Sequence, residues 1–106
     1  MAQVIWTEPA LFDLNEIAEY IALDKFDAAA QLVQEVFSAV ERLEAHPSSG
    51  RRPPELDRKS RYREVIVGPC RIFYRVEGEK VYILYVMRSE RELRKFILED
   101  RARESS

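Results

Sequence analysis

Residues 61–91 alternate between apolar and polar side chains, and two short segments typical of turns interrupt them. The interruptions are Gly68-Pro69 and Glu77-Gly78-Glu79. Connections of this length and composition join neighbouring antiparallel strands. The pattern therefore predicts a meander of three antiparallel strands, and the rest of the chain has to supply the elements that cover its apolar face.

The middle strand of this meander has one apolar face and one face with arginines, because successive side chains of a strand point to opposite sides. The apolar face consists of Cys70, Ile72, Tyr74 and Val76. The other face consists of Arg71, Phe73 and Arg75. The outer strands add arginines that we expect on the same side, namely Arg61, Arg63 and Arg88. This side is predicted to form a cationic cleft, and the alternative is an ordinary solvated face.

The length and composition of the chain restrict the class of protein. A chain of 106 residues with 46% hydrophobic and 34% charged residues is expected to form one globular domain, residues 1–106, with a single core. The sequence contains no apolar run of the length that crosses a membrane, and its first residues lack the pattern of a secretory signal. We therefore expect a cytoplasmic protein.

The cysteine and histidine content argues against a metal or disulfide site. The sequence has one cysteine, Cys70, and one histidine, His46, so it predicts neither an internal disulfide nor a Cys/His metal cluster. We interpret Cys70 as a small core residue. His46 precedes a proline at the end of a predicted helix, where an imidazole more often complements the helix dipole than serves in catalysis. We expect no cofactor and no metal.

The charges are unevenly distributed along the chain. The formal net charge of -2 and the pI near 5.5 argue against a protein that coats nucleic acid through bulk electrostatics. However, residues 51–75 contain eight basic side chains and three acidic ones, whereas residues 1–50 are acidic overall. This division predicts that the two halves of the chain face different partners.

Two amphipathic helices are predicted before the meander. A short β-prone segment at 4–6 leads into Thr7, a suitable N-cap, and apolar residues then recur at helical spacing up to about Leu23. The acidic residues left near solvent are Asp13, Glu16 and Glu19. Asp27 is the predicted cap of a second helix that ends at His46-Pro47. The two apolar stripes predict an αα-hairpin that packs on the apolar face of the meander.

One more helix is predicted after the meander. Residues 47–60 contain three prolines and no periodicity, so they predict a loop. Ser89 and Glu92 match a capping box, and the apolar residues that follow are Leu93, Phe96, Ile97 and Leu98. The tail RARESS, residues 101–106, is expected to be frayed, and the chain is expected to become flexible from about residue 99 on. The predicted class is α+β, with the order β-α-α-β-β-β(-α) and a small antiparallel sheet packed against the αα-hairpin.

Four segments of the chain carry a family resemblance. They are WTEPALFDLNEIAEYI, PSSGR, YREVIVGPCRIFYRVEG and VYILYVMR. Together they cover about residues 4–95 and resemble the ParE/RelE superfamily of type II toxin–antitoxin toxins. The resemblance implies a β-α-α-β-β-β fold with a variable C-terminal helix. It also implies a growth-inhibiting toxin that a co-expressed antitoxin of the ParD/RelB type neutralises in a hetero-oligomeric complex.

The superfamily divides by target, and the residues of this chain favour one branch. RelE-like members cleave mRNA on the ribosome with basic residues, whereas ParE-like members inhibit DNA gyrase and have no established nuclease centre. The ribonuclease members carry an essential arginine near the positions of Val65 and Ile66. Many members also have a histidine or a basic pair where this chain has Arg88 and Ser89. The resemblance therefore favours a ParE-like gyrase inhibitor.

Two alternatives remain open. The first is a ribosome-dependent mRNA endonuclease, which needs a base, an acid and a cation, and arginine supplies only the cation. Its candidate catalytic residues are Arg63, Arg71, Arg88 and Tyr85, with Tyr74 and Glu64 as further acid–base candidates. The second alternative is a relative that binds an antitoxin without being toxic.

For the gyrase hypothesis we expect two binding surfaces and no catalytic residue. The candidate target-binding residues are Arg63, Arg71, Arg75, Arg88 and Arg91. The candidate antitoxin-binding residues are Val33, Phe37, Phe96 and Ile97.

Overall fold

The predicted meander forms most of a four-stranded sheet in the computed structural model, which describes residues 1–105. The strands are β1 (Gln3–Trp6), β2 (Tyr62–Val67), β3 (Cys70–Glu77) and β4 (Lys80–Arg88). Their order in the sheet is β1-β4-β3-β2. β2, β3 and β4 pair in antiparallel fashion as predicted, whereas β1 pairs in parallel with β4. The sheet is therefore mixed and not purely antiparallel, because two helices cross one of its faces between β1 and the meander.

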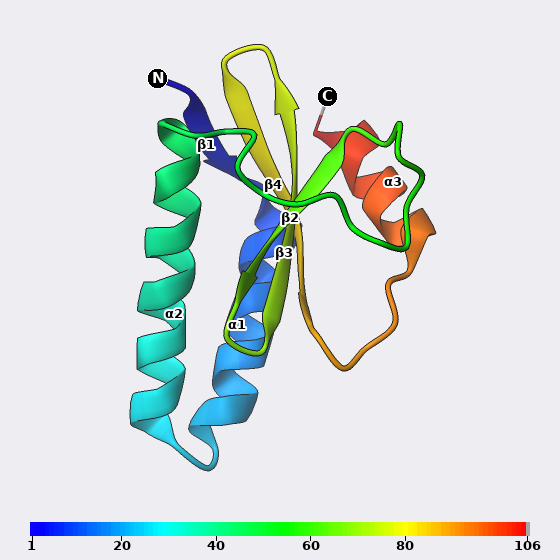
Figure 1. The fold of residues 1–106 in the computed structure, drawn as a ribbon. Coiled ribbons are helices and arrows are strands. Elements are labelled where there is room, and N and C mark those ends of the chain that lie inside the picture. Colours follow the sequence, from blue (N-terminus) through cyan, green and yellow to red (C-terminus); the bar gives the residue numbers. More distant parts are fainter. Residues whose placement is uncertain (106) are drawn as a thin grey trace.

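The helices follow the predicted order and lie in two different layers (Figure 1). They are α1 (Glu8–Ala22), α2 (Phe26–Glu41), the short 3-10 helix η1 (Arg42–Glu44) and α3 (Lys95–Glu104). α1 and α2 form the predicted αα-hairpin, and the figure shows α3 on the far side of the strands from α2. The β-α-α-β-β-β-α order is confirmed.

The αα-hairpin covers one face of the sheet as predicted. The buried residues under it include Ala10, Leu14, Leu32, Val36 and Leu43 from the helical side and Cys70, Ile72, Tyr74, Ile83 and Val86 from the strands. Cys70 is fully buried among them, which confirms it as a core residue. Burial of these apolar side chains is the main term that holds the hairpin on the sheet.

The opposite face of the sheet is also covered, which corrects the expectation of a solvated or cleft-like face. A second cluster of buried residues lies there, formed by Phe73, Leu84, Met87, Leu98 and Ala102. Leu56, from the loop between η1 and β2, packs against it. The sequence did not reveal this layer because α3 has a weak apolar stripe that contributes two buried residues.

A β-bulge between β3 and β4 increases the apolar area on the α3 side. Phe73 pairs with Tyr85 and Tyr74 pairs with Ile83, so Leu84 has no cross-strand partner. An extra residue of this kind interrupts strict alternation. Leu84 and Tyr85 consequently both pack in the cluster under α3, a change of face that the sequence pattern does not predict.

The structure confirms one predicted helix cap and corrects two. Thr7 accepts a hydrogen bond from the backbone N of Ala10 at 3.4 Å and donates to the carbonyl oxygen of Ile83 at 2.7 Å. α2 begins at Phe26, so Asp27 lies inside its first turn, where a carboxylate still complements the helix dipole. Ser89 is not a cap, because α3 begins only at Lys95. Ser89 lies at the end of the meander instead, where its backbone N donates to the carbonyl oxygen of Pro69 at 2.8 Å.

The last helix begins and ends later than predicted. α3 starts at Lys95 after Arg94, without a side-chain cap. It continues to Glu104, through most of the tail that we expected to be frayed, because Ala102 is buried and Arg101 bonds to Asp13. Of that tail, Ser106 lies outside the described residues. No helix in residues 1–105 has the length and apolar character that crossing a membrane requires.

Candidate functional site

Arg71 was expected to point into a cationic cleft, but it lies in a group of four charged side chains. This group, called the Glu64 network below, consists of Arg51, Glu55, Glu64 and Arg71. Arg71 donates from Nη1 and Nη2 to the two carboxylate oxygens of Glu55 at 2.6 and 2.7 Å. It also donates from Nε to Oε1 of Glu64 at 2.6 Å. Arg51 donates from Nε to Oε2 of Glu64 at 2.9 Å. These bonds fasten the loop that precedes β2 to the sheet.

Burial makes the charges of the Glu64 network depend on one another. Glu64 is 1% exposed and Arg71 is 7% exposed, and buried charges are stable when they are paired and hydrogen-bonded. Hydrogen bonds to Glu55 and Glu64 raise the pKa of Arg71 above its ordinary value. The hydrogen bond from Arg71 lowers the pKa of Glu55. Arg71 and Glu55 are therefore both ionised at neutral pH.

Arg75 is also an internal residue. Its side chain is on the α3 side, 1% exposed, and its Nη1 donates to the carbonyl oxygen of Ala102 at 2.9 Å. Its Nη2 lies 3.0 Å from Oε2 of Glu77, and its guanidinium carbon lies 4.9 Å from the ring centroid of Tyr82. The expectation that Arg71 and Arg75 line an exposed surface is therefore wrong.

Arg63 and Arg88 point to the hairpin side of the sheet. Directly opposite residues of an antiparallel pair share a face, and the register pairs Arg63 with Tyr74 and Arg88 with Cys70. Tyr74 and Cys70 both belong to the core under the hairpin. Four of the five arginines that we predicted as one target-binding surface are therefore divided between the two faces of the sheet, and the fifth, Arg91, lies in the segment after β4.

An open cleft of about 610 Å³ lies between α1 and the end of β4, and Arg88 and Arg91 line it. The guanidinium carbon of Arg88 lies 5.0 Å from the ring centroid of Tyr20 on α1. Its Nε lies 2.7 Å from Oε1 of Glu90. Arg91 is exposed. Two of the five predicted arginines thus share one accessible cleft, which we call the α1–β4 cleft.

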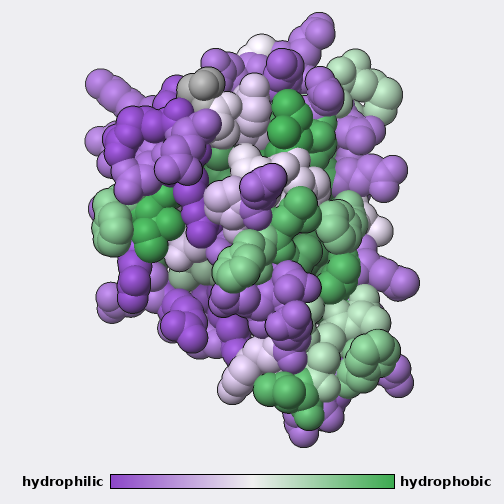
Figure 2. All heavy atoms as spheres, turned by 180° about the vertical axis from the view of Figure 1, so that it is seen from behind, coloured by the Kyte–Doolittle hydropathy of each residue, from purple (hydrophilic) through white to green (hydrophobic). Residues whose placement is uncertain are grey.

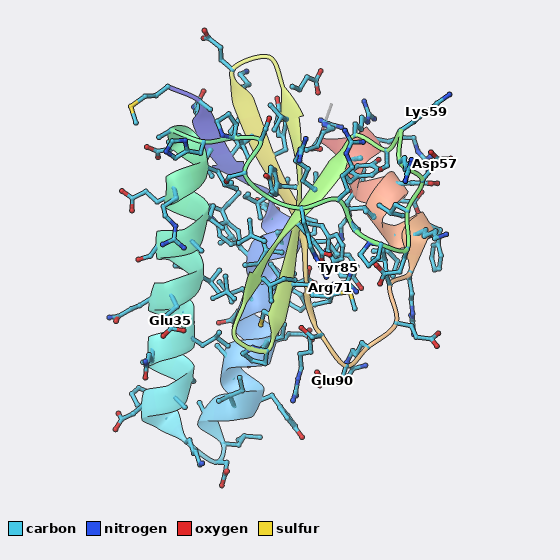
Figure 3. All side chains as sticks on the ribbon, in the orientation of Figure 1. Glu35, Asp57, Lys59, Arg71, Tyr85 and Glu90 are labelled. Carbon is cyan, nitrogen blue, oxygen red and sulfur yellow. The ribbon has the colours of Figure 1, made fainter. Side chains whose placement is uncertain are left out.

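The tyrosine proposed for a ribonuclease is packed among other side chains. Figure 3 shows Arg71 and Tyr85 on the side of the strands that faces α3. The ring of Tyr85 stacks on Phe73 with centroids 5.8 Å apart. The guanidinium carbon of Arg101 lies 4.6 Å from the centroid of Tyr85. Tyr85 is therefore flanked by an aromatic ring on one side and a cation on another.

The remaining acid–base candidates have structural surroundings. The hydroxyl of Tyr74 donates to the carbonyl oxygen of Pro47 at 2.8 Å and accepts from the backbone N of Gly50 at 2.9 Å. Burial raises the pKa of Tyr74, so its phenol keeps its proton at neutral pH. His46 is exposed and follows η1. In residues 1–105, no group of three or more His, Cys, Asp or Glu side chains is arranged to hold a metal ion.

The predicted antitoxin-binding residues lie in two separate places. Val33 and Phe37 belong to α2, and the ring of Phe37 lies 5.0 Å, between centroids, from that of Trp6. Phe96 and Ile97 belong to α3. α2 packs on one face of the sheet and α3 on the other (Figure 1). These four residues therefore do not form one continuous surface.

Sequence reasoning missed the pair formed by Asp13 and Arg101. Asp13 was expected near solvent, but it is partly buried, accepts a hydrogen bond from the backbone N of Val86 and binds Arg101. Helical periodicity puts Asp13 at the border of the apolar stripe, which was the one available signal. Arg101 lies in the tail that we expected to be frayed, so no pattern linked the two residues.

The arrangement of elements defines the class of the protein. The fold of an αα-hairpin packed on a sheet is similar to that of chains of two toxin–antitoxin systems. A chain of the chromosomal ParDE system from P. aeruginosa matches with a TM-score of 0.71 and 26% identity, covering 85% of this chain and 98% of that chain. A chain of the RelBE2 complex from Mycobacterium tuberculosis matches with a TM-score of 0.55 and 24% identity, covering 82% and 96%, a likeness that shows the fold alone.

Sequence comparison then identifies the family. Residues 4–93 match the family model of the ParE toxin of the type II toxin–antitoxin system parDE. The presumed toxin Y4kP of Sinorhizobium fredii is 37% identical over 92 residues, which are 85% of this chain and 91% of Y4kP. The chain belongs to the ParE toxin family of type II toxin–antitoxin systems. This membership confirms the resemblance on which the sequence-based hypothesis rested.

Proposed function

We propose that this toxin inhibits growth by binding DNA gyrase and that a cognate antitoxin neutralises it. Membership of the ParE family supports the toxin assignment. The observation that carries the choice of target is the Glu64 network, because it holds the guanidinium of Arg71 between two carboxylates inside the protein. A guanidinium in that position is part of the fold and is not available to a substrate.

A ribonuclease centre would need such a guanidinium to be free. Stabilising the charge on a phosphorane requires a cation that faces the substrate, and losing one preorganised donor costs enzymes on the order of 10²-fold or more in rate. Val65 and Ile66 stand where the ribonuclease relatives carry an arginine. Val65 packs against the core, and Ile66 presents an apolar side chain that is 47% exposed. These observations support a toxin that acts by binding.

The α1–β4 cleft is the surface that we propose for the target. Arg88 is oriented by the ring of Tyr20 and the carboxylate of Glu90, so its guanidinium is held at the cleft wall. Arg91 is exposed and, within residues 1–105, forms no ion pair. Arginines at the edge of a binding surface mainly raise the association rate and make it depend on salt. We therefore assign target binding to Arg88 and Arg91.

The antitoxin is proposed to bind the hairpin around Val33 and Phe37. Antitoxin segments of this kind fold on binding and lay an amphipathic helix or a strand on the toxin. The Trp6–Phe37 pair gives α2 an aromatic surface for such a segment. Phe96 and Ile97 on α3 are proposed as a second contact with the antitoxin. A long antitoxin segment would reach them by passing around the edge of the sheet. Gyrase and the antitoxin are both cytoplasmic, so we propose that the toxin acts in the cytoplasm.

Two assays with the purified protein test the proposed target. The first measures DNA supercoiling and cleaved DNA with purified gyrase, and the second measures mRNA cleavage on translating ribosomes. We expect inhibition and stabilised DNA breaks in the first assay and no cleavage in the second. The Arg88→Ala, Arg91→Ala double variant should lose the gyrase effect. The Lys95→Ala, Arg103→Ala double variant removes two exposed cations from α3 and should keep it.

Other results would select one of the alternatives. Reproducible mRNA cuts at the ribosomal A site that disappear on Arg63→Ala or Arg88→Ala substitution would establish the endonuclease and overturn the gyrase proposal. A folded protein that affects neither gyrase nor mRNA, and that still binds the antitoxin, would be a non-toxic relative.

A further inference from the structure

Arg88 presents the outer end of its guanidinium to the α1–β4 cleft without a partner in the described chain. Its side chain is 29% exposed, and the ring of Tyr20 lies against it, with 5.0 Å between the guanidinium carbon and the ring centroid. No oxygen of residues 1–105 accepts a hydrogen bond from Nη1 or Nη2 of Arg88. A packed arginine with an unpaired fork loses little side-chain entropy on binding. Arg88 is therefore preorganised to bind an oxyanion with two hydrogen bonds.

Glu90 contacts the same guanidinium from the turn that follows β4. Its Oε1 lies 2.7 Å from Nε of Arg88, but this ion pair lacks hydrogen-bond geometry, because the buried Nε has no hydrogen-bond partner. Figure 3 shows Glu90 near the lower end of the strands. Arg91 closes the turn, since its backbone N donates to the carbonyl oxygen of Arg88 at 3.1 Å. One turn thus places a carboxylate and two guanidiniums at the same end of the cleft.

The charges around the α1–β4 cleft nearly cancel. Two carboxylates and two guanidiniums line it, namely Glu16, Glu90, Arg88 and Arg91. A third carboxylate in the lining, Asp13, is paired with Arg101. A nucleic acid binds by releasing counterions from many phosphates, which requires a clear excess of basic side chains. The cleft has no such excess, so its charge disfavours a polyanion.

The cleft also offers apolar surface beside Arg88. The apolar and aromatic residues that line it include Ile17, Tyr20, Val86 and Met87. Figure 2 shows the face that carries α1, where apolar spheres are bordered by polar ones. A single carboxylate needs one guanidinium fork and not an excess of positive charge. An acidic side chain in a protein segment with apolar neighbours therefore fits both features of the cleft.

A basic group of the partner fits the cleft less well. Glu16 is exposed, so a cation that pairs with it has to fix two mobile side chains, and exposed ion pairs of this kind contribute little. The carboxylate of Glu90 already lies against Arg88. Arg88, in contrast, is held by Tyr20 before any partner arrives. The anchor of the cleft is therefore a cation, and the group that it binds is an anion.

We propose that Nη1 and Nη2 of Arg88 bind the carboxylate of an acidic side chain of the target protein in the α1–β4 cleft, and that Glu90 selects this group against nucleic acid. The inference rests on the proposed function, since it names the chemistry by which the cleft recognises its target. Glu90 puts a negative charge beside the bound anion. A nucleic acid brings several phosphates into this field, whereas the acidic side chain brings one charge, so Glu90 opposes nucleic acid more strongly.

Three probes of the full chain test the proposal without gyrase. Two are matched short peptides of leucines and neutral polar residues that differ at one central position, which is glutamate in one and glutamine in the other. The third is a short single strand of thymidine nucleotides. Binding is followed by nuclear magnetic resonance of the Nε–H group of Arg88 and of the backbone amides of residues 88–91. The glutamate peptide should shift these signals and bind at least about fivefold more tightly than either other probe.

Variants of the full chain test Arg88 as the anchor. Arg88→Lys keeps the charge but removes the fork, so the glutamate peptide should bind at least about fivefold more weakly. Tyr20→Leu keeps apolar bulk but removes the ring that fixes the guanidinium, so it should weaken binding about threefold. The control is Arg94→Lys, which makes the same exchange at an exposed arginine before α3 and should leave binding within about twofold.

Glu90→Gln tests the selectivity, because it removes the charge and keeps the size of the side chain. The affinity for the thymidine strand should rise at least about threefold more than the affinity for the glutamate peptide, since the strand carries more charges. The control is Glu99→Gln, which removes an exposed carboxylate of α3 and should change both affinities by the same factor, within about twofold. Equal effects of Glu90→Gln on both probes would reject the role of Glu90.

Three results would overturn the carboxylate site. They are equal binding of the two peptides, tighter binding of the thymidine strand than of the glutamate peptide, and unchanged peptide binding by Arg88→Lys. Circular dichroism of each variant verifies that it is folded, so a loss of binding reports on the cleft. Failure of the gyrase proposal has a different signature. Normal binding of the glutamate peptide with no effect on gyrase would reject the target assignment alone, whereas inhibited gyrase with equal binding of both peptides would reject the carboxylate site alone.

Discussion

Asp13 of α1 and Arg101 of α3 form a two-point ion pair although 88 positions separate them in the chain. Nη1 of Arg101 lies 2.5 Å from Oδ2 of Asp13, and Nη2 lies 3.1 Å from Oδ1. The pair also bonds to β4, at the carbonyl oxygen of Leu84 and the backbone N of Val86, each at 3.1 Å. β1 pairs with β4 only as far as Ile83. Asp13 and Arg101 therefore supply hydrogen-bond partners to backbone groups on the edge of β4 beyond the point where β1 ends.

The first prediction is that Asp13→Ala destabilises the whole fold. The substitution leaves Arg101 and the backbone N of Val86 without their acceptor, and breaking a partly buried pair of this kind costs about 3 kcal/mol. Urea unfolding at neutral pH measures the change. The control is Asp100→Ala, which removes the exposed partner of Arg103 and should cost about 0.5 kcal/mol or less. An equal loss of unfolding free energy in both variants would contradict the proposal that Asp13 stabilises the edge of β4.

The second prediction concerns pH. Since the pKa of Glu55 is lower in the folded protein than in the unfolded chain, Glu55 contributes stability above its unfolded pKa of about 4.3. That contribution is lost as the pH falls through the lower folded pKa. Glu55→Gln should therefore reduce the unfolding free energy at pH 6 by about 1 kcal/mol or less, and the difference from wild type should shrink below about pH 4. A difference that stays constant from pH 6 to pH 3 would show that Glu55 does not titrate in this way.

The sequence predicted the elements well because their signals are local. The meander follows from alternation and from two turns in which Gly68 and Gly78 adopt positive φ of 52° and 60°, a region that glycine enters without strain. The hairpin follows from apolar spacing. Thr7 was predicted as a cap from its own side chain and its neighbours. These are properties of short segments.

The sequence could not predict which element covers which face. Alternation put Arg71 and Arg75 on one side of β3 correctly, but it cannot tell that α3 and the loop before β2 cover that side. Arg63 and Arg88 were assigned to the wrong face because the cross-strand register was not known. Registers and long-range pairs depend on the complete fold. The candidate site was therefore predicted less well than the fold that contains it.

The third prediction tests the contact between Tyr74 and the segment that follows η1. Tyr74→Phe removes hydrogen bonds to Pro47 and Gly50 and leaves one buried and one partly buried backbone group unpaired, so it should cost about 1–3 kcal/mol. Gly50→Ala should cost at least as much, because a Cβ there would lie 2.5 Å from the hydroxyl oxygen of Tyr74 and 2.7 Å from the backbone oxygen of Glu64. Thermal unfolding measures both.

A matched pair of variants controls this prediction. Tyr20→Phe removes the hydroxyl of a tyrosine that is 62% exposed and should leave the melting temperature nearly unchanged. If Tyr74→Phe were as mild as Tyr20→Phe, the hydrogen bonds of Tyr74 would not contribute to folding stability.

The last prediction separates a structural role of Arg71 from a role in target binding. Arg71→Met alone leaves Glu64 buried with one ion-pair partner, Arg51, whose side chain is 58% exposed. Loss of one member of a buried network costs about 3–5 kcal/mol. Replacing both members, Arg71→Met with Glu64→Met, removes the unpaired charge and should restore much of that stability, since apolar residues of similar volume often replace buried ion pairs without loss.

Growth inhibition by the double variant then decides the role. If Arg71 serves the fold, the folded double variant should inhibit growth and gyrase nearly as well as the natural chain, although it lacks the guanidinium. Arg88→Ala is the positive control, because Arg88 lies in the proposed target cleft and its loss should reduce inhibition while the protein stays folded. A double variant that is as stable as the natural chain but inactive would return Arg71 to the target-binding residues, and the Glu64 network would then have to open when the target binds.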